Sequence, residues 1–385
     1  MPGQPSTFAA RPTPRNADVV AFCPYTDREH LLVCGCYELD DSTTPARRHG
    51  RLALLAVGAQ SDTLNEVSAI EGVGILDCSW LASSSTSNLP LLAVATSACD
   101  GRLHRLREVG DAVELEEACA TMPCADAGDA CMTLAWGTDA SALQLALSGT
   151  SGRVYVGQLH GAAGAADGLR MLSSWQAHDL ECWAVAFDLT NPMTLYTGAD
   201  DAQLKTWDLR CALSDAADGA GEDEEPAEPV ALASNRRSHQ AGVCCISPCP
   251  HRPHILATGS YDETARLWDC RMLKAPLGEL GCGGGVWRLK WHPTRTDLLL
   301  AACMHAGFAV LRTPTGAPEA AEATELEVVA RYEAHGTGAA LGYGADWSHA
   351  RVADGGALLA ATCSFYDRAL HVWHYNDHEQ VLSTS

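Results

Sequence analysis

The chain has 385 residues, 47% of them apolar, and contains no run of about 18 apolar residues that could cross a membrane. This composition favours a compact soluble protein with a large core. Its 48 acidic and 26 basic residues give a net charge of −22, which argues against binding to nucleic acid or to anionic membranes and favours a basic partner.

Cysteine is frequent, with 17 residues, but no two of them form a CxxC pair. The first residues, MPGQPSTFAARPTPRN, lack the continuous apolar segment of a secretory signal. We therefore expect reduced thiols that serve mainly as small buried side chains in a cytoplasmic protein. We also expect a monomer.

Three similar units follow one another in the first part of the chain. Each begins with a short apolar segment suited to an inner strand, namely VVAFCP, ILDCSW and MTLAWG, and continues as strand, turn and strand. In the first unit, the insertion from Leu39 to Gly50 is expected to lengthen the loop between the second and third strands. The three units are predicted at about residues 18–58, 68–108 and 130–159.

Two further units match each other closely. LYTGADDAQLKTWDLR and LATGSYDETARLWDCR share the pattern T-G-x-x-D-x5-W-D-x-R, and a histidine precedes each, His178 in one and His239 in the other. This is the WD-repeat pattern, in which four short antiparallel strands form one blade of a β-propeller. These blades are predicted at 178–210 and 238–271. The acidic segment 214–229 between them is expected to be a disordered insertion.

The repeat contains polar residues that can satisfy one another inside the blade. The indole N–H of Trp207 can donate to the Thr197 hydroxyl, and that hydroxyl can reach the ring of His178. The turn residue Asp201 can then orient the histidine, so that no buried polar group is left without a partner. The corresponding residues of the next blade are His239, Thr258, Asp262 and Trp268.

Two last units complete the series. WRLKWHP with LLLAACMHAGFAVLR, and YGADWS with ATCSFYDRALHVW, predict blades at about 285–313 and 341–375. Together the units predict an all-β, seven-bladed WD-repeat propeller that forms one domain over residues 1–385. An outer strand from one terminus must close the ring, and both STFAARPT and EQVLST are suitable.

Common catalytic motifs are missing from the sequence, which has no GxSxG, phosphate-binding glycine loop, HExxH or CxxC. The segment CCISPCPHRPH contains possible metal ligands, but alternate burial of cysteines on a first strand explains it better, because zinc ligands usually come as two pairs from separate segments. We expect neither a metal nor a cofactor. The possible ligands of this segment are Cys244, Cys245, Cys249, His251 and His254.

Propellers bind ligands at the mouths of their central channel, which the starts of the inner strands and the turns after the second strands surround. Aromatic side chains there suit a recognition surface or a cage that holds a quaternary ammonium group by cation–π attraction. Packing between blades is the alternative explanation for the tryptophans, and solvation on an acidic surface is the alternative for the carboxylates. The candidate binding residues are Glu181, Trp183, Asp200, Tyr261, Trp287 and Tyr343, and Asp18, Cys244 and Tyr366 occupy similar positions.

His305 is the candidate acid or base. It stands before Ala306, which replaces the turn aspartate of the repeat, so the usual partner of a histidine in this fold is missing. Cys303 stands two residues earlier, could face the same side of the strand and is the candidate nucleophile. Its position matches Gly259 of the repeat, which favours burial instead.

Several segments outside the general repeat pattern resemble one family. GGVWRLKWHP, AACMHAGF, YGADWS and ATCSFYD, in this order, are similar to the WD-repeat diphthine methyl ester esterases of diphthamide biosynthesis, which are also called diphthine methyltransferases. The resemblance covers the chain from about Asp18 to Trp373, and the acidic segment and the residues after Trp373 depart from it.

The resemblance implies an enzyme that acts on translation elongation factor 2. Diphthamide is a modified histidine of that factor, and the family hydrolyses a methyl ester on an intermediate that also carries a trimethylammonium group, giving diphthine and methanol. The resemblance supplies no catalytic residues, so the site is our own hypothesis. In it, Trp183, Trp287 and the nearby Glu181 and Asp200 hold the ammonium group, and His305 activates water or a thiol or hydroxyl neighbour. The competing hypothesis is a non-catalytic adaptor that docks proteins on the top face of the propeller, since a propeller alone does not imply an activity.

Overall fold

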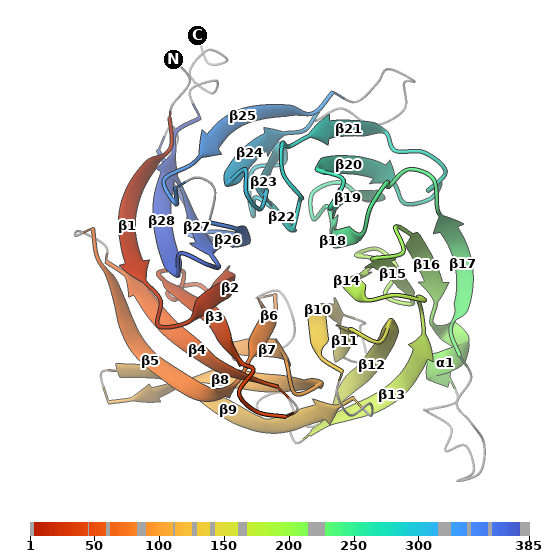
Figure 1. The fold of residues 1–385 in the computed structure, drawn as a ribbon, viewed down its shortest axis with the longest axis horizontal. Coiled ribbons are helices and arrows are strands. Elements are labelled where there is room, and N and C mark those ends of the chain that lie inside the picture. Colours follow the sequence, from red (N-terminus) through yellow and green to blue (C-terminus); the bar gives the residue numbers. More distant parts are fainter. Residues whose placement is uncertain are drawn as a thin grey trace.

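Seven antiparallel sheets surround a central channel in a computed structural model of the chain (Figure 1). The seven-bladed all-β propeller predicted from the sequence is confirmed. The structure describes residues 4–44, 46–58, 62–82, 90–110, 112–124, 129–138, 143–160, 168–214, 228–314, 325–336, 340–352 and 356–377.

Each sheet has four strands, which run in chain order from the channel to the rim except in the seventh blade. The inner strands are β2 (Asn16–Phe22), β6 (Ile75–Trp80), β10 (Cys131–Thr138), β14 (Cys182–Phe187), β18 (Val243–Pro248), β22 (Arg288–Trp291) and β26 (Gly342–Trp347). The second strands are β3 (Leu31–Asp40), β7 (Leu91–Thr96), β11 (Leu143–Gly149), β15 (Thr194–Ala199), β19 (Ile255–Ser260), β23 (Leu298–Ala302) and β27 (Leu358–Ser364).

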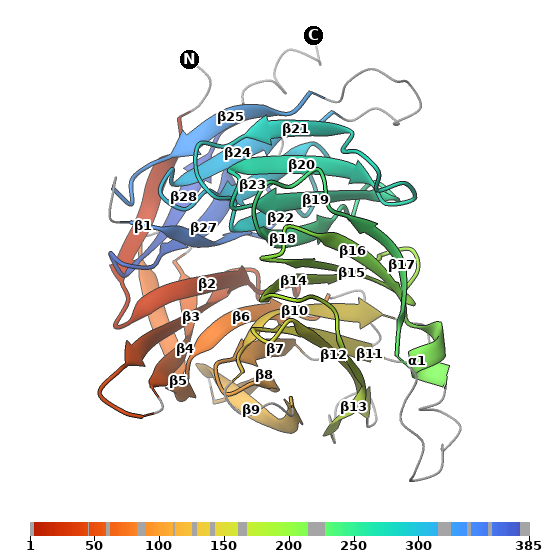
Figure 2. The ribbon, with the colours of Figure 1, turned by 45° about the vertical axis from the view of Figure 1, so that its right-hand side comes forward.

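The outer half of each sheet carries the more exposed strands. The third strands are β4 (Arg47–Val57), β8 (Asp100–Val109), β12 (Arg153–His160), β16 (Leu204–Asp208), β20 (Thr264–Asp269), β24 (Phe308–Arg312) and β28 (Ala369–Tyr375). The outermost strands are β5 (Leu64–Val73), β9 (Ala112–Pro123), β13 (Gly168–Gln176), β17 (Val230–Asn235), β21 (Gly278–Gly281), β25 (Glu327–Tyr332) and β1 (Ser6–Pro12). The short helix α1 (Arg210–Ser214) follows β16 and lies on the outside of the ring (Figure 2).

The N-terminal strand closes the ring. β1 pairs with β28 from Ser6 opposite His374 to Pro12 opposite Ala369 and so completes the seventh blade. The Thr7 hydroxyl also bonds the hydroxyl of Tyr332 in the neighbouring blade at 2.8 Å. STFAARPT is therefore the closing segment, while the other possible one, EQVLST, lies outside the described residues.

Two insertions expected from the sequence have different outcomes. The segment from Leu39 to Gly50 is mostly strand, because β3 and β4 continue into it and pair as far as Asp40 opposite Arg47. It extends a hairpin rather than forming a long loop. Of the acidic segment 214–229, residues 215–227 lie outside the described residues.

The polar network predicted for the repeats is present in the fourth blade. Trp207 donates its indole N–H to Thr197 at 2.8 Å, the Thr197 hydroxyl bonds His178 at 2.7 Å, and the other ring nitrogen of His178 lies 3.0 Å from Asp201. In the fifth blade the guanidinium of Arg266 stands between His239 and Asp262 instead. In the seventh blade Trp373 and His335 both bond the Thr362 hydroxyl, while Asp367 lies 3.8 Å from His335, beyond hydrogen-bond distance.

A β-bulge near the start of the inner strands turns one side chain per blade toward the mouth of the channel. In blades one to five and in blade seven, the pairing of the inner strand with the second strand skips one residue of the inner strand. In blade six, both Trp287 and Arg288 stand opposite Ala302. Bulges redirect side chains in this way. The bulged residues are Asp18, Leu76, Met132, Trp183, Cys244, Trp287 and Tyr343.

The contribution of the network to stability can be measured by replacing two buried threonines of the fourth blade, one inside the network and one outside it. Thr197→Val should lower the free energy of unfolding by about 2–4 kcal/mol, because it leaves a buried indole N–H and a buried imidazole without partners. Urea unfolding followed by tryptophan fluorescence would measure it.

The matched control is Thr206→Val. The Thr206 hydroxyl is also buried, but it has no hydrogen-bond partner among the described residues, so its loss should be neutral or slightly stabilising. Equal destabilisation by the two variants would contradict the role of the network.

Candidate functional site

Four aromatic side chains from four consecutive blades meet at one mouth of the channel. We call Trp183, Tyr261, Trp287 and Tyr343 the aromatic mouth. The ring centroids of Trp183 and Trp287 lie 5.5 Å apart, and Tyr261 lies 6.2 Å and 6.0 Å from these two rings. Tyr343 lies 4.9 Å from Trp287 on the other side. All four were predicted from the sequence as binding residues, and the structure brings them together.

The rings of the aromatic mouth touch one another, so they form a continuous surface rather than an open cage. Tyr261 is 37% exposed, and the other three side chains are half-buried. The indole N–H groups of Trp183 and Trp287 are buried and have no acceptor among the described residues. An unpaired buried donor is costly, and both groups are closed off from solvent, so the rings must turn before these N–H groups meet a bound acceptor.

Two predicted carboxylates lie at the blade-four and blade-five side of the aromatic mouth. Asp200 is exposed in the turn after β15, and its backbone N–H donates to the carbonyl of Glu181 at 2.9 Å. A side chain added at Gly242 would meet both the Asp200 carboxylate, at 2.6 Å, and the ring of Tyr261, at 3.2 Å. The Asp200 carboxylate and the Tyr261 ring therefore flank the same glycine and offer a negative charge beside an aromatic face.

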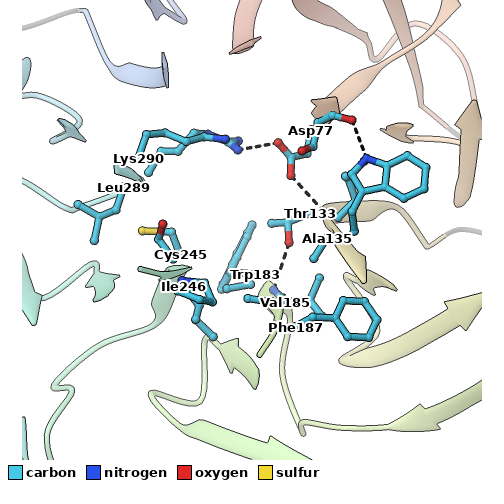
Figure 3. Close-up of a pocket in the computed structure, with 18 of the residues that line it drawn as sticks. Asp77, Thr133, Ala135, Trp183, Val185, Phe187, Cys245, Ile246, Leu289 and Lys290 are labelled. Atoms are coloured by element: carbon cyan, nitrogen blue, oxygen red, sulfur yellow. Dashed lines mark hydrogen bonds and ion pairs between the residues drawn. The ribbon is translucent and has the colours of Figure 1, made fainter. Parts of the chain in front are cut away.

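Below the aromatic mouth, the channel contains a cavity of about 310 Å³ (Figure 3). Trp183 and Trp287 line it together with residues of the inner strands of blades two to six, most of them apolar. Two charged residues of the lining meet across the channel, since Arg288 of blade six lies 2.6 Å from Asp77 of blade two. Asp77 also accepts the backbone N–H of Leu134 at 3.1 Å.

Burial shapes the charges of this pair and of a third residue, Asp18. Burial alone would lower the pKa of Arg288, but Asp77 and Asp18 raise it, so the guanidinium stays charged. Asp18 is only 3% exposed, and burial raises the pKa of its carboxyl to about 7, although the charge of Arg288 opposes this shift. A carboxyl that titrates near neutral pH at the mouth of a channel is a candidate acid or base.

The structure separates His305 from Cys303. His305 is exposed in the turn between β23 and β24. Cys303 is fully buried between blades five and six, and both the hydrogen bond of its thiol with Cys282 and burial raise its pKa well above the ordinary value. A buried neutral thiol is a poor nucleophile.

The ligand-like segment CCISPCPHRPH does not assemble into one site. Cys244 and Cys249 are buried, His251 bonds the carbonyl of His292 at 2.7 Å, and His254 lies beside Cys270 at 4.0 Å. These partners lie in different directions, as expected for an inner strand and its loop.

Sequence reasoning missed the pair of Asp77 and Arg288, and it placed Asp18 at the mouth without a catalytic role. One signal was available, because Asp18 and Asp77 are single charged residues in otherwise mainly apolar first-strand segments. Such a residue faces either the channel or a buried partner.

The fold and its repeats define the chain as a WD-repeat β-propeller. The family described as "WD domain, G-beta repeat" matches residues 169–208 and 232–269. A chain in the "Crystal Structure of Mitotic Checkpoint Complex" is similar in fold, with a TM-score of 0.62 over 97% of this chain and 92% of that chain, at 16% identity.

Similarity over most of the sequence is more specific. Diphthine methyltransferase of Homo sapiens is 33% identical over 87% of this chain and 73% of its own length. The Schizosaccharomyces pombe protein of the same name is 30% identical over 91% and 93%, and a Dictyostelium discoideum homolog is 29% identical over 93% and 96%. The chain belongs to the diphthine methyltransferase family, which confirms the resemblance of its non-repeat segments.

Among the described residues, α1 is the only α-helix, and it is five residues long. No helix among the described residues could therefore cross a membrane.

The raised pKa of Asp18 makes the stability of the fold depend on pH. Between about pH 4 and pH 7 the unfolded chain releases the proton that the folded carboxyl retains, so the contribution of Asp18 to stability falls as pH rises. Asp18→Asn removes this loss and should raise the free energy of unfolding at pH 8 by on the order of 2 kcal/mol.

The measurement is urea unfolding of both proteins between pH 4 and pH 8. The stability difference should shrink toward pH 4. Asp62→Asn, at an exposed position, is the control and should show no such trend. A difference between wild type and Asp18→Asn that is constant across this range would contradict the assignment.

Proposed function

We propose that this protein hydrolyses the methyl ester of diphthine methyl ester on translation elongation factor 2, giving diphthine and methanol. Membership of the diphthine methyltransferase family supports a role in diphthamide biosynthesis. The observation that carries the proposal is the aromatic mouth, which joins four rings and the neighbouring Asp200 carboxylate at the opening of the channel.

The aromatic mouth suits the trimethylammonium group of this substrate. A quaternary ammonium ion cannot donate hydrogen bonds, so aromatic faces and nearby negative charge are what can bind it. Trp183, Tyr261 and Trp287 offer the faces, and the Asp200 carboxylate beside Tyr261 offers the charge. Glu181 is the second carboxylate predicted from the sequence. Tyr343 extends the surface toward blade seven.

Ester hydrolysis also requires donors for the carbonyl oxygen, which gains negative charge when water attacks. The indole N–H groups of Trp183 and Trp287 lack an acceptor among the described residues, but both are buried, so donating to the carbonyl requires the rings to turn toward the channel. The ester and the ammonium group belong to one small side chain, so both must be bound at the same mouth.

A base must take a proton from the attacking water while the methoxy group leaves as methanol. His305 is our sequence-based candidate, on the exposed turn after β23. Asp18 is the second candidate, because its pKa of about 7 allows it to accept and return a proton near neutral pH.

The reaction can be tested with elongation factor 2 that carries the methyl-esterified intermediate. Incubation with the purified protein should lower the mass of the modified peptide by one methylene group and release methanol. A parallel sample with S-adenosylmethionine tests methyl transfer, which would raise the mass instead. Binding of the factor without any change of mass would favour the non-catalytic adaptor.

Substitutions at Trp287 separate ring chemistry from packing. Trp287→Leu should raise KM by about 10-fold or more, since a desolvated cation–π contact is worth about 2 kcal/mol. Trp287→Phe keeps a ring and should fall between this variant and wild type. Equal KM values for the Leu and Phe variants would contradict binding of the cation by the ring.

The base can be assigned by comparing His305→Ala with Asp18→Asn in the same assay. If His305 is the base, its loss should lower kcat by about 100-fold or more, while Asp18→Asn has a small effect. The reverse pattern assigns the base to Asp18. Near wild-type kcat in both variants would show that neither residue is the base.

A further inference from the structure

Three buried cysteines meet at the junction of blades two and three. The sulfur atoms of Cys99, Cys124 and Cys131 all lie within 4.8 Å of one another. The side chains are 4%, 7% and 0% exposed, and the sulfurs of Cys124 and Cys131 lie 3.7 Å apart. This arrangement is compact enough for the three sulfurs to contact one ion.

The three residues come from strand ends on the face that carries the aromatic mouth. Cys99 lies in the turn between β7 and β8, Cys124 directly follows β9, and Cys131 begins β10. The backbone holds the first two in place, because Cys124 donates its N–H to the carbonyl of Cys99 at 2.9 Å. Ligands from turns and strand ends are typical of structural metal sites in small β units.

Metal ions bind the thiolate form of cysteine, so binding at this cluster releases the thiol protons. Other buried thiols of the chain also contact one another, such as Cys282 and Cys303, but they form a pair. Among the described residues, Cys99, Cys124 and Cys131 are the three thiols that converge on one point.

The neighbouring carboxylate of Asp129 is engaged by other groups. It accepts the N–H groups of Ala130 at 2.8 Å and Ser151 at 2.9 Å and the Tyr155 hydroxyl at 3.3 Å, and the Thr150 hydroxyl also donates to it. Within the part of the chain that the structure describes, the site thus offers three sulfur ligands.

We propose that Cys99, Cys124 and Cys131 bind one Zn²⁺ ion, which joins the turn of blade two to the first strand of blade three. Three soft sulfur ligands that converge on one point select zinc over magnesium or calcium. Binding displaces the remaining thiol protons to solvent and involves no oxidation or reduction. The site does not depend on the esterase activity, since its ligands lie outside the aromatic mouth.

Metal analysis of the full-length protein tests the proposal directly. Protein produced with zinc in the medium should contain about one zinc per chain by elemental mass spectrometry. Cys131→Ser and Cys99→Ser should lose most of it. Cys282→Ala is the matched control, because it removes a buried thiol that contacts another cysteine, and it should retain the zinc.

A second measurement keeps the test valid if the serine variants fold poorly. Wild-type protein stripped with a chelator and loaded with Co²⁺ should develop the near-ultraviolet band of cobalt–thiolate bonds, and Zn²⁺ should abolish it. Chelation alone should lower Tm, because the ion binds the folded state. Stripped protein that gives no cobalt–thiolate band would overturn the proposal, and so would an intact mass two hydrogens lower, which indicates a disulfide.

Discussion

The pairing of β1 with β28 is the contact on which the rest of the molecule depends. Each sheet of the ring packs against two neighbouring sheets. Blades one and seven become neighbours because β1, which leads directly into blade one, is the outermost strand of blade seven. Closure fixes the distances between blades that share no strand. Arg288 and Asp77 illustrate this, since they come from blades six and two and meet only because the inner strands surround one axis.

The proposed active site follows from a small irregularity repeated around that axis. A bulge near the start of the inner strands directs one side chain per blade to the mouth, and the residue type then decides the chemistry. Blades four, six and seven contribute Trp183, Trp287 and Tyr343, while blade one contributes Asp18. The ring of blades holds these groups in place, and blades one and two add the charged residues Asp18 and Asp77.

The sequence was sufficient for the architecture because each blade encodes its own strands, turn and polar network locally. It also placed Trp183, Tyr261, Trp287 and Tyr343 together, since their positions in the repeat are equivalent or adjacent around the mouth. It could not predict the pairing of Asp77 with Arg288, because nothing in the spacing of residues 211 positions apart shows that they meet. The cluster of Cys99, Cys124 and Cys131 was missed for a related reason, as its members come from different strands and no CxxC spacing marks them.

Closure by the first strand has a consequence during protein synthesis. The ribosome releases β1 first, but its partner β28 follows about 360 residues later, so at roughly 5–20 residues per second the strand waits on the order of 20–70 seconds. During this time six complete sheets can form while β1 lacks its partner strand and the face of blade one that packs against blade seven is uncovered. The high negative charge of the chain opposes pairing of the waiting strand with other chains before the last blade emerges.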